Sequence, residues 1–360
     1  MPAQNPDMEP LLEIEEVCKY FPVKKGFLQR HVGDVKALDG VSFTVNRGET
    51  VGLVGESGCG KTTLGRVVAG AHKATSGGVR FNNPDGDPVD VGTLRGDQLN
   101  NYLTHVQMVF QDPYSSLNPR RTVMQIIEEP LICLTEFSPK KRRARVFELL
   151  EVVGLNRRHA ERYPHAFSGG QRQRIGIARA LAVDPSLLVC DESVSALDVS
   201  VQGQIINLLM KLRAERGLSY LFISHDLAVV RHISDRIAVM YVGKLVEWAP
   251  AKEIFTSPRH PYTEALLSAV LRPDPGHPLD AMVLEGDVAD PANRPSGCSF
   301  HPRCRYAQDI CRTDEPPMAA MNNDGQERLA ACHFAKELKL SGIDDDPAKQ
   351  PEKMLRSEPQ

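Results

Sequence analysis

The sequence predicts an α/β protein whose core is a doubly wound parallel β-sheet. The first observation is an apolar run at 49–54, which precedes a Gly-rich turn and a helical pattern. The second is that similar buried runs recur at 106–110, 187–190 and 221–223. The third is that a special residue stands just past each strand: Gly55, Gln111, Asp191 and His225. Because ligands bind beyond the carboxyl ends of such strands, we expect these four positions to share one edge of the sheet.

Composition and charge limit the classes of function. With 360 residues the chain has room for one large or two medium domains, and 41% hydrophobic and 25% charged residues are ordinary globular values. The net charge of −3 gives no strongly basic surface for nucleic acid. We expect no membrane-spanning helix, because no apolar run reaches about 18 residues. The first ten residues have no features of a secretory signal.

The N-terminal segment at 11–47 is predicted to be β structure. Leu12, Ile14 and Val17 indicate a short strand, and the alternation over 35–45 predicts a hairpin that turns at Asp39-Gly40. Between them, Tyr20-Phe21 precedes the basic stretch KKGFLQRH. An aromatic ring here has two interpretations, namely an edge or core residue, which this segment alone favours, or a ring that stacks on adenine.

Residues 55–62 match G-x-x-x-x-G-K-[ST] at every fixed position, between a predicted strand and a predicted helix. The glycines let backbone N–H groups turn toward phosphate oxygens, and the helix N-terminus adds partial positive charge. In such a loop Lys61 contacts the β/γ-phosphates and Thr62 ligates Mg²⁺. A chance match in a Gly-rich turn is the alternative, which the flanking strand and helix disfavour. The predicted nucleotide-binding residues are Gly55, Glu56, Ser57, Gly58, Cys59, Gly60, Lys61, Thr62 and Thr63.

The middle of the chain contains segments with weak and with strong secondary-structure patterns. Residues 71–100 predict turns and short edge strands, because they hold few apolar residues. A strand at 106–110 ends at Gln111, which is placed to reach Mg²⁺ or an attacking water. Helices are predicted at 123–134 and 139–155, the second with Ser138 as N-cap. Its KKRRAR run is interpreted as a solvated face rather than a binding patch.

A second helix N-terminus suited to anions opens at Ser168-Gly169-Gly170 and leads the helix at 167–183. The strand that follows ends in Asp191-Glu192, and paired carboxylates at a strand end suit a division of labour. Asp191 would hold Mg²⁺ and Glu192 would polarise the attacking water. After an amphipathic helix at 201–216, the strand at 221–223 ends in Ser224-His225-Asp226.

Taken together, residues 12–270 resemble the nucleotide-binding subunit of an ATP-binding cassette (ABC) transporter. The motifs are the Walker A loop, the Q-loop Gln111, the signature FSGGQ, the Walker B pair Asp191-Glu192, the D-loop SALD at 195–198 and the switch His225. Phe167 stands where the commonest signature has Leu. The stretches VKALDGVSF, GESGCGKTT, VFQDPYSSLNPR and HPYTEALLSAV are similar to ATPase subunits of bacterial dipeptide, oligopeptide and nickel importers, and this likeness reaches about residue 335.

The resemblance implies an architecture and its boundaries. The expected fold is an ABC nucleotide-binding domain with a RecA-like parallel core, an antiparallel β subdomain, an α-helical signature subdomain and a small Cys-rich C-terminal appendage. The ATPase domain would span 10–255 and the appendage 256–340. The polar segment at 341–360 would be a disordered tail.

The resemblance also implies how the sites work. Two cassettes would pair head to tail, with each ATP between one P-loop and the other chain's Ser168, Gly169, Gly170 and Gln171. Asp198 would join the nucleotide site, and Phe21 would stack on adenine, with Tyr20 as the alternative. Mg²⁺ would be held by Thr62, Gln111 and Asp191. Catalysis would rest on Glu192, His225 and Gln111.

The implied function is an ATPase that powers uptake of di- or oligopeptides at the cytoplasmic face of the cell membrane. Its partners would be two membrane permease subunits, a similar but non-identical second ATPase and an extracytoplasmic solute-binding protein, with no nucleic acid. A nickel or other small-solute importer is the alternative. A soluble ABC ATPase fits less well because the chain has neither a second cassette nor a coiled-coil insert, and the HPYT segment and Cys tail disfavour an exporter.

Four of the eight cysteines crowd into the C-terminal stretch as Cys298-x₅-Cys304-x₆-Cys311-x₂₀-Cys332. Three interpretations compete: reduced structural thiols, a zinc site and a [4Fe–4S] cluster. Zinc knuckles space cysteines two to four residues apart, so these wider spacings favour the cube, whose corners lie farther apart. The resemblance adds weight, since the pattern accompanies such a cluster in peptide-importer ATPases. His301 and His333 are alternative ligands.

Overall fold

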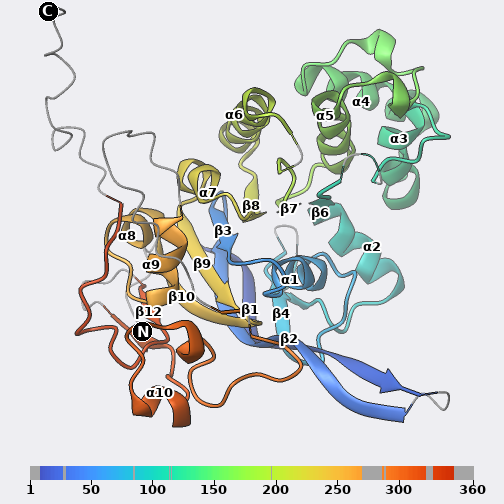
Figure 1. The fold of residues 1–360 in the computed structure, drawn as a ribbon. Coiled ribbons are helices and arrows are strands. Elements are labelled where there is room, and N and C mark those ends of the chain that lie inside the picture. Colours follow the sequence, from blue (N-terminus) through green and yellow to red (C-terminus); the bar gives the residue numbers. More distant parts are fainter. Residues whose placement is uncertain are drawn as a thin grey trace, which may run out of the picture.

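The structure is a computed structural model that describes residues 9–26, 30–83, 86–112, 114, 116–195, 197–269, 286–287, 289–321 and 327–343. Across these ranges the strands form two sheets, and the helices divide between the main sheet and a separate helical part (Figure 1). Most of the predicted tail and Ala196 of the D-loop lie outside the described residues.

The larger sheet contains the predicted parallel core, with its strands in the order β9, β3, β8, β7, β6. These strands are β3 (Thr50–Val54), β6 (Val106–Val109), β7 (Leu187–Asp191), β8 (Ser219–Ile223) and β9 (Arg236–Tyr241). Every pair within this part is parallel. The order of the strands differs from their order in the chain, so each connection crosses over the sheet and carries helices onto its faces.

Both faces of this sheet are buried, which explains why the strands are continuous apolar runs rather than alternating ones. In β8, Tyr220 and Phe222 pack into one core cluster, whereas Leu221 and Ile223 pack into the other. The helices against the sheet are α1 (Lys61–Val68), α2 (Gly96–His105), α6 (Val199–Arg216), α7 (Leu227–Ile233), α8 (Ala251–Thr256) and α9 (Pro261–Ser268).

The antiparallel sheet is formed by β1 (Pro10–Lys25), β2 (Arg30–Asn46), β4 (Ser76–Phe81) and β5 (Val89–Asp90). The predicted hairpin turn at Asp39-Gly40 is wrong, because these residues lie inside β2. The register shifts there, with Val17 opposite Val41 but Lys19 opposite Leu38, and Gly40 has a φ of +75°. Asp39-Gly40 is therefore a β-bulge, in which a glycine takes the left-handed conformation without a change in chain direction.

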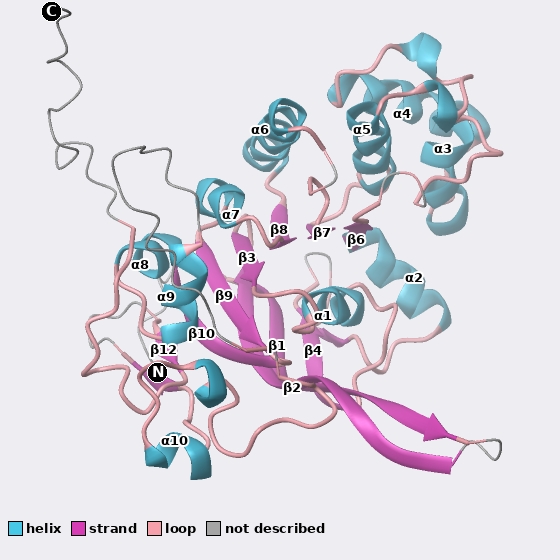
Figure 2. Cartoon of the chain, viewed as in Figure 1, coloured by secondary structure: helices cyan, strands magenta, loops and turns pink. Residues whose placement is uncertain are grey.

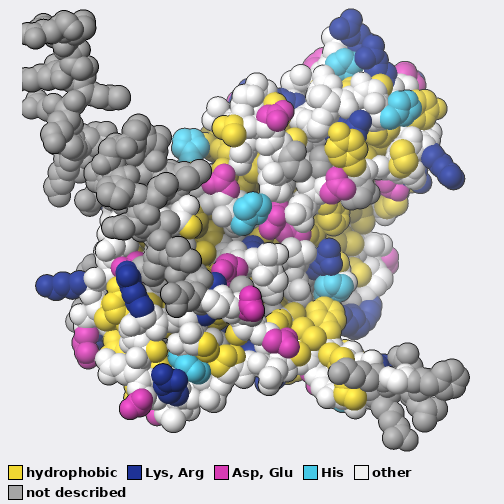
Figure 3. Space-filling model, viewed as in Figure 1, with side chains coloured by type: hydrophobic (Ala, Val, Ile, Leu, Met, Phe, Trp, Pro, Cys, Tyr) yellow, Lys and Arg dark blue, Asp and Glu magenta, His cyan; other side chains and the backbone are white. Residues whose placement is uncertain are grey.

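The helical part consists of α3 (Val123–Leu134), α4 (Pro139–Val152), α5 (Gly169–Ala180) and the short turns η1 (Arg157–His159) and η2 (Pro164–Ala166), and it lies on the β6 side of the main sheet (Figure 2). The Ser138 hydroxyl caps α4, as predicted, by accepting from the N–H of Lys141. Lys and Arg side chains gather at the tip of this part (Figure 3). Arg142 pairs with Glu128 and Arg145 with Asp184, so the basic run is partly neutralised.

Helix α2 was not predicted, because 71–100 was assigned to turns and edge strands. Its sequence, GDQLNNYLTH, carries only Leu99, Tyr102 and Leu103 toward the core. Their spacing fits one helical face, but three apolar residues over ten positions give a weak periodic signal.

After the parallel core the chain adds β10 (Lys244–Pro250), which pairs antiparallel with β9. The Cys-rich segment consists of short elements, namely η3 (His301–Arg303), α10 (Asp309–Thr313), β11 (Ala319–Ala320) and β12 (Leu329–Ala330). Since β12 pairs with β10, this segment extends the main sheet. None of the described helices combines the length and apolar character needed to cross a membrane.

Candidate nucleotide-binding site

The P-loop connects β3 to α1 and depends on glycine at two positions. Gly55 and Gly60 have φ values of +148° and +104°. A Cβ at Gly55 would lie 2.2 Å from the carbonyl oxygen of Met240, and one at Gly60 would lie 2.2 Å from that of Ala37. Both glycines are therefore required by close backbone approach as well as by conformation. They bring the loop against β9 and β2 and fix its path to the start of α1.

Lys61 is buried at the centre of this loop, with 4% of its surface exposed. Its Nζ donates to the carbonyl oxygens of Gly55 and Glu56 at 2.7 and 3.0 Å. The ammonium group is thus enclosed by the backbone of the loop whose N–H groups the motif assigns to phosphate. A positive charge held there gives the loop an electrostatic preference for anions.

The carboxylate that ends β7 contacts the first turn of α1. Thr62 Oγ1 donates to Asp191 Oδ1 at 2.9 Å. Burial raises the pKa of Asp191 above its ordinary value and the negative charge of Glu192 acts in the same direction, while the bond from Thr62 opposes them. A hydroxyl beside a buried carboxylate is a donor set that fits Mg²⁺, so Thr62 and Asp191 are suited to hold this ion.

Three predicted catalytic side chains converge beside this pair. Glu192 Oε2 accepts from Gln111 Nε2 at 2.8 Å and lies 3.3 Å from Nδ1 of His225. They come from the loops after β6, β7 and β8, so the structure brings together the strand-end residues that the sequence indicates. Glu192 also has a φ of +43°, which is uncommon for a residue other than glycine.

The signature residues form a complete helix cap elsewhere in the molecule. Ser168 Oγ accepts from the N–H of Gln171, and Gln171 Oε1 accepts from the N–H of Ser168. This capping box opens α5, which packs with α3 and α4 in the helical part (Figure 1). Gly170 is buried, and a Cβ there would lie 2.3 Å from Val201. The hydrogen bonds described for Ser168 and Gln171 stay within this cap and do not reach the P-loop.

Two aromatic rings compete for the predicted adenine contact. The Tyr20 hydroxyl donates to Asp39 and its ring faces Lys36. Phe21 is 37% exposed and meets His72 edge to face with the ring centres 5.9 Å apart. The more exposed ring is therefore that of Phe21. Asp198 stands at the N-terminus of α6, without a side-chain cap bond, on the loop that follows Glu192.

Sequence reasoning missed two residues that contact the P-loop. The Tyr262 hydroxyl accepts from the N–H of Glu56 at 2.7 Å, and Arg303 makes two hydrogen bonds to the Glu56 carboxylate. Tyr262 belongs to the HPYT segment, which was noted only as a family feature. Arg303 belongs to the Cys-rich stretch, and no local pattern singled it out.

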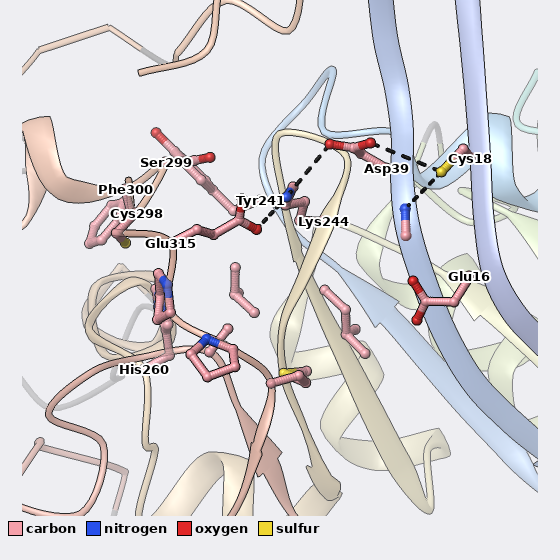
Figure 4. Close-up of a pocket in the computed structure, with 17 residues that line it drawn as sticks. Glu16, Cys18, Asp39, Tyr241, Lys244, His260, Cys298, Ser299, Phe300 and Glu315 are labelled. Atoms are coloured by element: carbon pink, nitrogen blue, oxygen red, sulfur yellow. Dashed lines mark hydrogen bonds and ion pairs between the residues drawn. The ribbon is translucent and has the colours of Figure 1, made fainter. Parts of the chain in front are cut away.

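Beside this junction lies a cavity of about 440 Å³ between the β1–β2 sheet, the β9–β10 hairpin and the appendage (Figure 4). Lys244 lies between Asp39 and Glu315 and forms ion pairs with both. Glu16, Cys18 and His260 also line the cavity. The described residues of the P-loop do not line it, so this cavity is separate from the nucleotide site.

The four clustered cysteines line one small cavity in the appendage, together with His301 and His333. All four are free of disulfides. Burial raises the pKa of Cys304 to about 11 and that of Cys332 to about 12, and neighbouring thiols add to both shifts. In the described part of the chain, however, no group of three or more His, Cys, Asp or Glu side chains has the arrangement to hold a metal ion. The thiols gather without forming a closed ligand set.

A nucleotide loop, a carboxylate pair and a signature cap on this fold define an ABC-type ATPase, and the comparisons with known proteins agree. A family model described as "ABC transporter" matches residues 38–195. A second, "Oligopeptide/dipeptide transporter, C-terminal region", matches 246–311. Among solved structures, the dimeric ATP-binding cassette MJ0796 bound to ADP and Pi is 31% identical, with a TM-score of 0.58 over 67% of this chain and 98% of that one.

Curated relatives narrow the class. The oligopeptide transport ATP-binding protein AppF of Bacillus subtilis is 50% identical over 93% of this chain and 99% of its own length. The dipeptide transport ATP-binding protein DppF of Escherichia coli is 47% identical over 90% and 94%. The chain belongs to the ATP-binding proteins of the oligopeptide/dipeptide ABC importer family. It is the ATPase subunit of a di- or oligopeptide importer, and its hydrolysis of ATP is coupled to transport.

Proposed function

We propose that ATP binds with its phosphates along 55–63 and is hydrolysed at the edge of the sheet where Gln111, Glu192 and His225 meet. The observation that carries the proposal is the pair of contacts on Glu192 Oε2, from Gln111 at 2.8 Å and His225 at 3.3 Å. A carboxylate held from both sides is oriented to accept a proton from an attacking water. Lys61 binds the β/γ-phosphates, and its charge stabilises the terminal phosphate as bond cleavage proceeds.

Thr62, Asp191 and Gln111 would hold Mg²⁺, which neutralises charge on the phosphates when bound. The contact of Thr62 with Asp191 at 2.9 Å supports this assignment for two of the three residues. Gln111 has a second role in the proposal. Its amide already donates to Glu192, so a shift of Gln111 would also move the proposed base.

The nucleotide site is proposed to be completed by a second ATPase subunit, because the signature cap at 168–171 lies on the helical part rather than beside the P-loop. Ser168, Gly169, Gly170 and Gln171 would meet the ATP bound to the partner, and Asp198 would lie near the junction. The dimeric form in which the related cassette MJ0796 was solved with ADP and Pi supports this arrangement. Phe21 is proposed to stack on adenine, in line with its exposed ring.

The transporter around this subunit is proposed to contain two permease subunits, a similar but non-identical ATPase and an extracytoplasmic solute-binding protein. The subunit would then work at the cytoplasmic face of the cell membrane. The names of the curated relatives, which specify dipeptide and oligopeptide transport, support a peptide cargo. We retain 10–255 and 256–340 as the proposed domain boundaries.

Equilibrium binding of ATP to the full chain tests the nucleotide site. The wild type should bind MgATP, and Lys61→Ala should weaken binding at least tenfold, because it removes a charge-assisted contact to phosphate. Lys211→Ala, on the exposed face of α6, is a matched control that removes a lysine without touching the loop. A wild-type chain that does not bind ATP, or a Lys61→Ala chain that binds it normally, would refute the assignment.

For the appendage we propose that Cys298, Cys304, Cys311 and Cys332 hold one [4Fe–4S] cluster that stabilises the fold, with zinc as the alternative. Their common cavity supports convergence on one group, although in the described part of the chain the four thiols do not form a closed ligand set and would have to move closer together to bind it. A segment with few buried apolar residues gains stability from such a group. Anaerobic purification followed by iron, sulfide and zinc analysis decides between the two. About four irons and four sulfides per chain are expected, whereas one zinc without iron would refute the cluster.

A further inference from the structure

Glu56, the second residue of the P-loop, is held by two residues that follow the parallel core. Its backbone N–H donates to the Tyr262 hydroxyl at 2.7 Å. Its carboxylate accepts from both terminal nitrogens of Arg303, from Nη1 at 2.7 Å and from Nη2 at 3.0 Å. The Arg303 side chain is 7% exposed and that of Glu56 is 25% exposed, so the pair is largely shielded from water.

A two-bond pair of this kind fixes orientation as well as distance, because the planar guanidinium matches both carboxylate oxygens. The effect extends to the phosphate-binding lysine. The Glu56 carbonyl oxygen accepts from Lys61 Nζ at 3.0 Å. Arg303, Glu56 and Lys61 therefore form an unbroken series of contacts from the appendage to the ammonium group of the P-loop.

The appendage in turn holds Arg303 firmly. Arg303 ends η3, the single turn between Cys298 and Cys304. Phe300, just before this turn, packs against Tyr241 at the end of β9 and against Tyr262, with ring centres 5.3 and 5.4 Å apart. His301 Nδ1 lies 3.0 Å from the carbonyl oxygen of Cys298. The turn is therefore fixed by aromatic packing on one side and by the cysteine-bearing segment on the other.

We propose that Arg303 is a positioning residue for the P-loop, so that the Cys-rich appendage sets the affinity of the subunit for ATP. Arg303 does not touch the nucleotide in this account. It holds Glu56, and through Glu56 the loop that receives the phosphates. The inference rests on the nucleotide site proposed above and adds a role for the appendage in that site.

The test measures KM for ATP and kcat of the transporter assembled with full-length subunit. Arg303→Gln should raise KM roughly tenfold and change kcat less than about twofold, because ATP at a saturating concentration restores the conformation of the P-loop. Arg303→Lys, which keeps the charge but loses the fork, should lie between wild type and Arg303→Gln. Partial misfolding would give the opposite result, a lower kcat with an unchanged KM, and would count against the proposal.

Two further variants keep the result specific. Arg305→Gln removes a charge on the other side of Cys304, where Arg305 lies 3.7 Å from Glu264, and should leave KM unchanged. Glu56→Gln disturbs the pair without altering the appendage. The factors by which Glu56→Gln and Arg303→Gln raise KM should therefore not multiply in the double variant. A KM within twofold of wild type for Arg303→Gln, or independent effects in the double variant, would overturn the inference. A wild-type chain that does not bind ATP would instead refute the proposed function.

Discussion

At the scale of single residues, backbone conformation places the proposed base. Glu192 has a φ of +43°, which costs on the order of 1 kcal/mol for a residue with a side chain. This conformation follows directly after the last residue of β7 and leaves the carboxylate within reach of Gln111 and His225. The unfavourable conformation therefore coincides with the residue to which the chemistry is assigned.

The P-loop glycines provide a prediction that separates conformation from steric clash. Gly60→Ala should destabilise the chain by about 1–3 kcal/mol more than Gly58→Ala. Both positions have positive φ, but a Cβ at Gly60 would lie 2.2 Å from the Ala37 carbonyl oxygen, whereas Gly58 has open space. The strain of the left-handed conformation, about 1–2 kcal/mol, is common to both variants. Urea unfolding of the two variants measures the difference, and equal losses would show that the clash at Gly60 is relieved.

At the residue scale the sequence predicted which side chains lie together at the edge of the sheet, while their chemical roles stay predictions. The P-loop motif and the polar residues past each strand needed only the periodicity of buried runs and the rule that ligands lie beyond the strand ends. Prediction failed for Arg303, whose partner Glu56 is 247 residues away. A lone arginine in a Cys-rich stretch gives no sign of its partner, because such a pairing depends on how the appendage folds back onto β10.

At the scale of elements, the sequence predicted α3, α4, α5 and α6, with Ser138 as the cap of α4, whereas α2 was missed because it has few apolar residues. The Asp39-Gly40 turn was wrong for a different reason. An Asp-Gly pair favours both a hairpin turn and a bulge, since each needs a glycine with positive φ. The pairing of β1 with β2, which continues over nearly the full length of both strands, decides in favour of the bulge.

Helix α9 provides a pH-dependent prediction. His260 Nδ1 accepts from the N–H of Tyr262 and caps this helix, and burial lowers the pKa of His260 to about 3. A histidine with a depressed folded pKa contributes stability that is present above about pH 6.5 and lost as the pH falls toward 3. The free energy of unfolding should therefore decrease by about 1 kcal/mol for each pH unit below 6.5 from this residue.

Urea unfolding of wild type and His260→Asn at pH 7, 6 and 5 checks this prediction. Asn keeps an acceptor for the cap but does not titrate in this range. The comparison also separates the titration of His260 from that of Glu247. The Glu247 carboxylate accepts from the backbone N–H of residue 260 and is present in both proteins. The difference in free energy of unfolding between the two proteins should change in favour of the variant as the pH falls. A constant difference would show that the imidazole does not lose stability on protonation.

At the scale of the whole molecule, the P-loop and the signature cap lie in different parts of one chain, and for this reason we propose that a second subunit completes the nucleotide site. Alone, the chain should be a weak ATPase and mostly monomeric without ATP. Light scattering with and without MgATP measures this. A tight dimer that forms without nucleotide would contradict the composite site, unless a variant shortened before the appendage lost that dimer.

The fold at this scale was predictable because its motifs follow the order of an ABC cassette, and the comparisons confirm that class. The contact between appendage and cassette was not predictable. It depends on β12 pairing with β10 and on Phe300 packing against Tyr241 and Tyr262, and two-residue strands leave no clear pattern in a sequence.

The central claim is that ATP is hydrolysed by Glu192 at the shared strand edge, and one measurement tests it most directly. Steady-state ATPase activity of the assembled transporter should fall to about one hundredth or less with Glu192→Gln, because the proton acceptor is lost. Equilibrium ATP binding should stay within about twofold of wild type, since the P-loop is unchanged, and closed ATP-bound dimers should accumulate. Near-normal turnover by Glu192→Gln would contradict the account and assign the base to another residue.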